Sequence, residues 1–140
     1  MKALVCGGRH YVNGNHVSSV LDKFDPNEVV CGGASGADDL AVDWAKRHGK
    51  VVHIYFPDWD ANGRAAGPMR NQKMLDEEKP DIVIAFPGGK GTDDTIRRAN
   101  KAGVCVWASR DPSKETWDWE ETPSGVEHPF WSSYEKDPKQ

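Results

Sequence analysis

The chain has 140 residues, which is enough for one domain with a hydrophobic core of its own. Its net charge of −4 argues against general nucleic-acid binding, which rests on a surplus of lysine and arginine. Three cysteines without close spacing, Cys6, Cys31 and Cys105, do not fit a disulfide framework or a cysteine metal site, and we expect all three to be buried thiols.

Five short apolar runs predict strands, and four amphipathic segments between them predict helices. The strands are expected at 2–6, 28–31, 51–55, 81–85 and 104–107, and the helices at 15–24, 36–48, 68–78 and 92–102. The runs are rich in valine and isoleucine, which is typical of strands buried on both faces of a parallel sheet. The alternation predicts an α/β fold, a Rossmann-like three-layer sandwich with a parallel sheet of about five strands and helices on both faces.

Glycine and proline mark where the predicted helices begin and end. Gly49 and Gly103 stand where two of the helices should stop, and Gly67-Pro68 should open the helix at 68–78. Residues 56–67 show no periodicity, and a connection of this length is often functional. Trp59 within it either stacks on a ligand base or anchors the loop by packing.

The composition changes after the last predicted strand. We predict one Rossmann-like nucleotide-binding domain over 1–108 and a C-terminal extension over 109–140 that is rich in tryptophan and proline. The extension either packs back on the domain or a partner, or is irregular. The first residues contain too few apolar side chains for a signal peptide, and no run approaches the ~20 apolar residues of a membrane span, so we expect a cytoplasmic protein.

Three glycine pairs follow three of the predicted strands: Gly7-Gly8, Gly32-Gly33 and Gly88-Gly89. Ligands of open parallel sheets bind beyond the carboxyl ends of the strands. Two of these loops lead directly into a helix N-terminus, where free N–H groups favour an anion. Three pairs at one sheet edge favour ligand binding over plain tight turns. Neither a Walker A loop nor a GxGxxG fingerprint is present.

Polar residues beside the glycines have two interpretations. Ser35 and Asp38 have the spacing of a capping box, and Thr92 precedes an acidic first turn, so these residues either cap helices or contact the ligand. Arg70 falls in the first turn of a predicted helix, where a cation opposes the helix dipole unless a phosphate or carboxylate compensates it. The histidines show no metal-binding spacing, so we expect no metal and no cofactor. The candidate ligand-binding residues are Gly7, Gly8, Arg9, Gly32, Gly33, Ala34, Ser35, Gly36, Asp38, Arg64, Arg70, Asn71, Pro87, Gly88, Gly89, Gly91, Thr92 and Asp93.

Four stretches together resemble the SLOG superfamily, and most closely its YspA-like, cpYpsA-related branch. They are Gly7-Gly8-Arg9, GGASGADDLAVDWA from Gly32, AAGPMRN from Ala65 and DIVIAFPGGKGTDD from Asp81. The resemblance covers 2–106. It implies a Rossmann-like fold that binds a nucleotide or a nucleotide-derived ligand.

The same superfamily contains the Lonely Guy phosphoribohydrolases, which cleave the bond between a base and ribose 5′-monophosphate. Their motif, PGGxGTxxE with an arginine on the preceding helix, is matched here at Pro87, Gly88, Gly89, Gly91 and Thr92. Arg70 looks like the arginine. Thr95 stands where those enzymes have the glutamate, and Asp94 is one residue earlier.

The first function hypothesis is a sensor or ligand-binding module for a nucleotide-like small molecule, with Arg70 as a phosphate clamp. The alternative is an N-glycosidic hydrolase of nucleoside 5′-monophosphates, with Arg70 and Asp94 as catalytic residues acting on an oxocarbenium-like state. Single-stranded DNA binding, as in the DprA branch of the superfamily, is disfavoured by the acidic balance. The resemblance to Lonely Guy relatives also implies a homodimer.

Overall fold

A computed structural model describes residues 1–109 of the chain. In chain order the elements are β1 (Lys2–Cys6), α1 (Gly14–Phe24), β2 (Glu28–Cys31), α2 (Ala37–Arg47), β3 (Val51–Ile54), α3 (Trp59–Asn62), the 3₁₀ turn η1 (Gly63–Ala65), α4 (Ala66–Glu78), β4 (Ile82–Ala85), α5 (Lys90–Lys101) and β5 (Cys105–Ala108). The predicted extension lies, from residue 110 onward, outside the described residues. Within residues 1–109 no helix is both long and apolar enough to cross a membrane.

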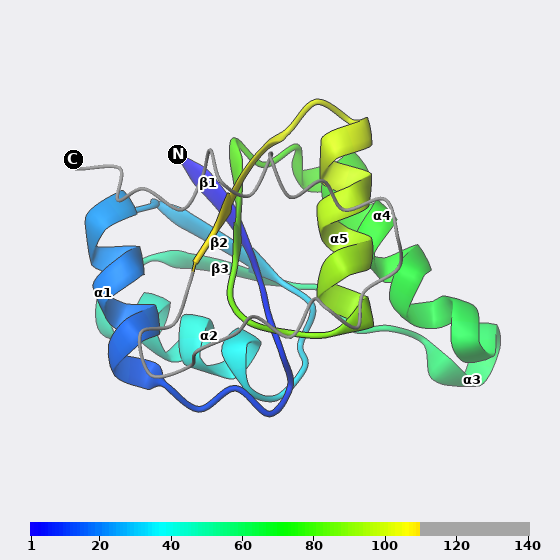
Figure 1. The fold of residues 1–140 in the computed structure, drawn as a ribbon, viewed down its shortest axis with the longest axis horizontal. Helices are drawn as coiled ribbons and strands as arrows, with labels where there is room; N and C mark the ends of the chain where they lie inside the picture. Colours follow the sequence, from blue (N-terminus) through cyan, green and yellow to red (C-terminus); the bar gives the residue numbers. More distant parts are fainter. Residues whose placement is uncertain (110–140) are drawn as a thin grey trace.

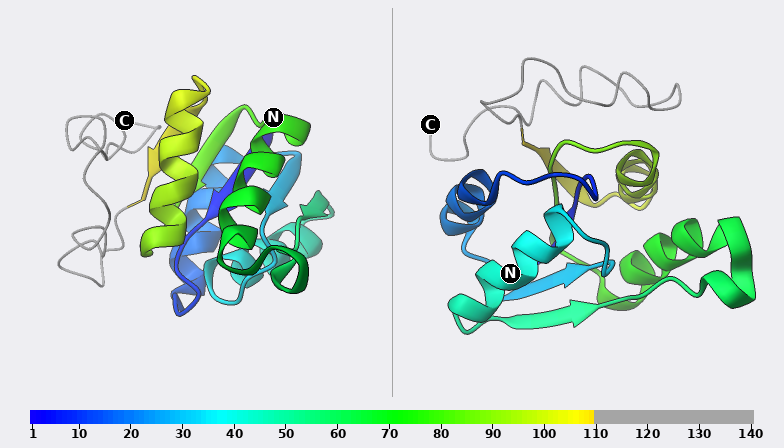
Figure 2. Two further views of the ribbon diagram at one scale, coloured as in Figure 1. Left: turned by 90° about the vertical axis from the view of Figure 1, so that its right-hand side faces the viewer. Right: turned by 90° about the horizontal axis from the view of Figure 1, so that it is seen from below.

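The five strands form one parallel sheet in the order β3-β2-β1-β4-β5 (Figures 1 and 2). Helices α1 and α2 pack together on one face, and α4 and α5 pack together on the other. This arrangement confirms the predicted Rossmann-like α/β fold. The chain reverses its direction of travel across the sheet at β1, which lies between β2 and β4. Ligand sites of such folds lie at this kind of reversal.

The two faces of the sheet bury two separate cores, as the strand period of two requires. In β1, Ala3 and Val5 face α1 and α2, where Trp44 is fully buried. Leu4 and Cys6 face α4 and α5 and belong to the other core. The central strands therefore carry apolar residues on both faces, which explains their uninterrupted apolar sequence.

Two expectations about burial are wrong, and both fall on edge strands. The strand at 51–54 is not buried on both faces, because β3 has a neighbour only on one side and Val51 is about half exposed. Cys105 begins the other edge strand, β5, and its thiol is exposed, whereas Cys6 and Cys31 are buried as expected.

The connection at 56–67 is not an unstructured loop as predicted. Asp58 caps the four-residue helix α3 by accepting a hydrogen bond from the Ala61 N–H at 3.1 Å, and η1 then leads directly into α4. A helix of one turn is too short to show a hydrophobic period. Consequently α4 begins at Ala66, and Pro68 is its third residue rather than its first.

Other predicted helix boundaries agree closely with the structure. Helix α2 ends before Gly49 and α5 before Gly103, and both glycines have the positive φ angles that favour glycine after a helix. Helix α5, however, begins at Lys90 rather than at 92, with Gly89 as its N-cap. Thr92 is thus inside the first turn and does not cap the helix.

Candidate functional site

The three glycine loops meet at one edge of the sheet, because β2, β1 and β4 are adjacent. The Gly8 N–H donates to the Pro87 carbonyl at 2.8 Å, and the Ala37 N–H donates to the Gly8 carbonyl at 3.1 Å. The loop after β1 is therefore bonded to both of the others. Together with the start of α4 they line a cleft of about 800 Å³, a volume within the usual range for small-molecule sites.

Close packing of the loops requires glycine at several positions, of which Gly36 and Gly88 are examples. A Cβ atom at Gly36 would lie 2.3 Å from the Gly8 oxygen, and the Gly36 φ of 77° is one that side chains rarely adopt. A Cβ at Gly88 would lie 2.2 Å from the Thr92 hydroxyl and 2.7 Å from the Gly8 nitrogen. These glycines build the site, since no other residue lets the loops approach so closely.

Gly89 and Gly91 have no such structural need. A Cβ at either position would meet no atom within 4 Å, and neither residue has a positive φ. Gly91 is the second residue of α5, where glycine is less favourable than alanine. Both glycines line the cleft, and the N–H groups of the first turn of α5 have no partner within the helix. The missing side chains leave that turn open to the cleft.

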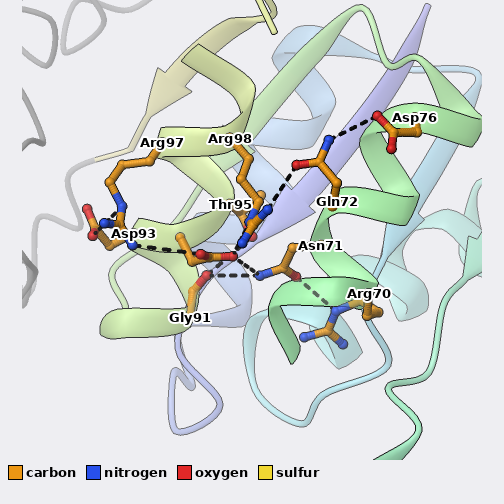
Figure 3. A network of polar contacts seen from close by, with 10 residues as sticks. Arg70, Asn71, Gln72, Asp76, Gly91, Asp93, Thr95, Arg97 and Arg98 are labelled. Carbon is orange, nitrogen blue, oxygen red and sulfur yellow. Dashed lines mark hydrogen bonds and ion pairs between the residues drawn. The ribbon is translucent and has the colours of Figure 1, made fainter. Parts of the chain in front are cut away.

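Arg70, which lies on α4, lines the same cleft. Its Nε donates to Asn71 Oδ1 at 2.9 Å (Figure 3). Its Nη1 donates to the Gly32 carbonyl. Among residues 1–109, no hydrogen bond is formed by Nη2. Burial lowers the pKa of Arg70 from its ordinary value, while the charge of Asp38 opposes that shift. The sequence pattern predicts Arg70 in the first turn of its helix, and this prediction is wrong. Because α4 begins at Ala66, Arg70 is its fifth residue and lies beyond the first turn.

A chain of polar contacts continues from Arg70 to α5. Asn71 Nδ2 donates to Asp94 Oδ2 at 3.0 Å, and Arg98 Nε donates to the same oxygen at 2.8 Å (Figure 3). Arg98 also donates to Gln72 at 3.0 Å. Asp94 is not among the residues that line the cleft. Its carboxylate joins α4 to α5 instead of lining the cleft.

Asp38 is the one carboxylate among the described residues that line the cleft. The capping-box prediction is wrong, because Gly36 is the N-cap of α2 and no side chain caps the helix. Asp38 Oδ2 instead accepts from the N–H groups of Gly32 at 3.1 Å and Ala34 at 3.2 Å. Burial raises the pKa of Asp38 to about 6, against the opposing effects of the backbone N–H bonds and Arg70. Ser35 donates to the Arg9 carbonyl and ties two loops together.

The cleft carries more positive than negative charge although the chain as a whole is acidic. Arg9, Arg70 and Lys90 line it, and Asp38 is the carboxylate that faces them. His10 lies beside Arg9 at the rim and is exposed. No group of three or more metal-binding side chains occurs within residues 1–109. An arrangement of this kind suits an anion, and α5 supplies backbone donors to the same space.

The structure brings together most of the residues predicted from the sequence. Those that line the cleft are Gly7, Gly8, Arg9, Gly32, Ala34, Asp38, Arg70, Asn71, Pro87, Gly88, Gly89, Gly91 and Thr92. Those that do not are Gly33, Ser35, Gly36, Arg64, Asp93 and Asp94. Arg64 lies exposed in η1, and Asp93 is buried against Arg97, 3.2 Å away.

Several lining residues are absent from the predicted set. They are Val5, Cys6, His10, Tyr11, Trp59, Met74, Lys90 and Thr95. His10 and Tyr11 directly follow the first glycine loop, so proximity in the sequence was a usable signal. Met74 lies one turn after Arg70 on α4, and only the packing of that helix against the sheet brings it to the cleft.

Comparisons with known proteins agree with this architecture. A family model described as the YspA, cpYpsA-related SLOG family matches residues 1–61. The Gene 61 protein of Mycobacterium phage D29 is 41% identical in an alignment of 85 residues, and the match covers 56% of this chain and 67% of the phage protein.

Two solved structures share the fold. DNA processing protein A (DprA) from Streptococcus pneumoniae has a TM-score of 0.68 at 20% identity, over 81% of this chain and 52% of DprA. The chain therefore spans about half the length of DprA. The structural-genomics target TM1055 has a TM-score of 0.57 at 23% identity, over 76% of this chain and 72% of that one.

Proposed function

The chain belongs to the YspA, cpYpsA-related SLOG family, and from that premise we propose that it binds a nucleotide or a nucleotide derivative as a sensor or ligand-binding module. The phosphate group of the ligand lies against the first turn of α5, and Arg70 contacts it from the opposite wall of the cleft. A helix N-terminus and a guanidinium are both strong phosphate ligands.

The observation that carries this proposal is the open first turn of α5. Neither Gly89 nor Gly91 has a positive φ or an atom within 4 Å of an added Cβ, and both line the cleft, so this turn presents backbone without side chains there. A phosphate placed there meets backbone donors, the helix dipole and Arg70 together. Arg9 and Lys90 at the rim add attraction for an anion approaching from solvent.

Trp59 supplies a surface for the base. Trp59 is 59% exposed although it lines the cleft, and it belongs to α3, which comes shortly before α4, the helix that carries Arg70. A Cβ at Gly67 would lie 3.6 Å from the Trp59 ring, so the indole lies against the start of α4. An exposed indole stacks on any of the common bases. The ligand would therefore extend from the α5 turn toward Trp59.

The second candidate function is N-glycosidic hydrolysis, and one observation favours it. Asp38 lines the cleft with a pKa raised to about 6, which suits a group that exchanges protons near neutral pH. Two observations favour binding without turnover. Thr95, at the glutamate position of the related hydrolases, donates its hydroxyl to the Gly91 carbonyl at 3.2 Å, and Asp94 is engaged by Asn71 and Arg98.

Titration calorimetry with the four common nucleoside 5′-monophosphates and the matching nucleosides tests the proposal. We expect saturable binding that is tighter for the monophosphates, and weaker binding of every base by Trp59→Ala. Equal affinity for nucleoside and monophosphate would contradict a phosphate site on α5.

Chromatography of the same mixtures distinguishes binding from hydrolysis. Release of free base by the wild type, lost in Asp38→Asn, would identify an enzyme. Tighter binding of an oligonucleotide than of any monophosphate would favour single-stranded DNA instead.

A further inference from the structure

We infer that Asp94 is a positioning residue, which fixes the Arg70 guanidinium through the Asn71 amide and aligns it with the first turn of α5. The inference rests on the proposed function for the role of Arg70 toward phosphate. It differs from a catalytic role for Asp94, because the carboxylate lies outside the cleft and its hydrogen-bonded route to Arg70 passes through Asn71, beside the direct attraction between the two charges.

The direction of the Asn71 amide follows from the chemistry of its two neighbours. A guanidinium only donates hydrogen bonds, and a carboxylate only accepts them. The amide between Arg70 and Asp94 therefore has one orientation, with its oxygen toward Arg70 Nε at 2.9 Å and its nitrogen toward Asp94 Oδ2 at 3.0 Å. Removing Asp94 removes the closer of the two acceptors of Asn71 Nδ2 and leaves the Gly91 carbonyl at 3.5 Å, so the amide, and Arg70 Nε with it, would be held less firmly.

Asp94 is itself held firmly in place. Arg98, one turn later on α5, donates to Asp94 Oδ2 at 2.8 Å, and Arg97 lies 3.7 Å from the other carboxylate oxygen. The Asp94 side chain is only 15% exposed. A charge-assisted contact that is partly shielded from water is stronger than one on the open surface. The two arginines thus keep the acceptor on α5 where Asn71 of α4 can reach it.

Arg70 is consequently attached at two of its three nitrogens. Nε is held by Asn71, and Nη1 is held by the carbonyl of Gly32. This leaves Nη2 to contact a ligand with little further loss of side-chain freedom, which is the cost that a flexible arginine meets on binding. Asn71 Nδ2 also lies 3.5 Å from the Gly91 carbonyl, so the same amide relates Arg70 to the turn that offers backbone donors.

Two variants interrupt this connection from opposite ends. Asp94→Ala removes the acceptor, and Asn71→Ser removes the amide while leaving the contact of Asp94 with Arg98. Asp94→Asn retains an acceptor oxygen for Asn71, so it should keep Arg70 positioned nearly as in the wild type. Asp76→Ala is the control, because Asp76 accepts from Gln72 at 2.9 Å at the far end of the same network and does not touch Asn71.

The first measurement needs no ligand. Hydrogen exchange of the Arg70 Nε–H, followed by ¹⁵N NMR on the full chain, should be slow in the wild type and in Asp76→Ala. It should be markedly faster in Asp94→Ala and Asn71→Ser, with Asp94→Asn close to the wild type. Unchanged exchange in Asp94→Ala would overturn the inference whatever the protein binds.

The second measurement uses adenosine 5′-monophosphate and adenosine as probes. The ratio of their affinities should fall by about ten-fold in Asp94→Ala and Asn71→Ser, as expected when one charge-assisted contact is weakened. When Asp94→Ala is combined with Arg70→Lys, the affinity ratio should fall little further than in Arg70→Lys alone, since both substitutions act on the same contact. If the wild type does not prefer the monophosphate, the proposed function fails. If the wild type prefers the monophosphate and both variants keep the same affinity ratio, the proposed function stands and the positioning role of Asp94 is refuted.

Discussion

Replacing Gly91 with alanine should make the free protein more stable and the ligand complex weaker. Gly91 is the second residue of α5, it is exposed, and a Cβ there would meet no atom within 4 Å. The substitution therefore introduces no clash in the unliganded protein. It does place a methyl group over the turn that is proposed to receive the phosphate.

The two effects have opposite signs and can be estimated separately. Alanine is favoured over glycine in a helix by roughly 0.5–1 kcal/mol, which should raise the melting temperature by about 2–5 °C in a domain of this size. Displacing a phosphate from one charged hydrogen bond costs about 1.5–3 kcal/mol, so the affinity should fall by roughly 10- to 100-fold. A residue that served only the fold would not separate stability from binding in this way.

Asn100→Ala is the matched control, because Asn100 is exposed near the other end of the same helix and does not line the cleft. Alanine is favoured over asparagine inside a helix as it is over glycine. Differential scanning calorimetry and titration with adenosine 5′-monophosphate, run on both variants, should show a similar gain in stability and a loss of affinity only for Gly91→Ala. Unchanged affinity in Gly91→Ala would refute the argument that this turn is open in order to bind a ligand.

Three further predictions concern stability and reactivity. The pKa of Asp38, raised to about 6 from an ordinary 3.8, means that its stabilising contribution is fully present below pH about 4 and is lost as the pH rises through 6. Urea unfolding across this range should therefore show a loss of about 3 kcal/mol that is absent in Asp38→Asn; parallel curves for the two proteins would contradict it. Burial raises the pKa of the Cys6 thiol far above its ordinary value and that of Cys31 to about 12. Iodoacetamide followed by mass spectrometry should accordingly label Cys105 in the native protein and the other two only after unfolding, and early labelling of Cys31 would count against its burial. Gly36→Ala should lower the free energy of unfolding by roughly 1–3 kcal/mol in denaturant titrations, since its φ of 77° and the nearby Gly8 oxygen exclude a side chain, and a neutral result would refute that strain.

The sequence by itself was sufficient to predict the layers of the fold and the edge at which the site lies. Apolar runs separated by helical patterns predict a parallel sheet, and the period of each element depends only on local geometry. The glycine pairs after β1, β2 and β4 could be located for the same reason, because the end of a strand is a local feature. That these three strands are adjacent followed from their pairing in the sheet.

The roles of individual polar side chains were decided by the tertiary structure. Asp38 and Asp94 both follow a glycine loop in the sequence, and the sequence offers Asp38 as a ligand contact or a cap and Asp94 as a catalytic residue. Asp38 lines the cleft because its carboxylate accepts from the loop at Gly32, whereas Asp94 lies outside it because Asn71 and Arg98 engage it between two helices. Gly32 and Arg98 lie 6 and 4 positions from their partners along the chain, whereas Asn71 lies 23 positions from Asp94 on another helix, and only folding brings that contact about.

Capping patterns were unreliable for a related reason. Ser35 and Thr92 have the spacing of helix caps, yet Gly36 and Gly89 occupy the N-cap positions. A cap is defined by where the chain turns, and in this protein the turns are set by the contacts of one loop with another, such as that of the Gly8 N–H with the Pro87 carbonyl. Local sequence therefore determined which segments are helices and strands, while contacts between distant segments determined which side chains face the cleft, because only folding brings those segments together.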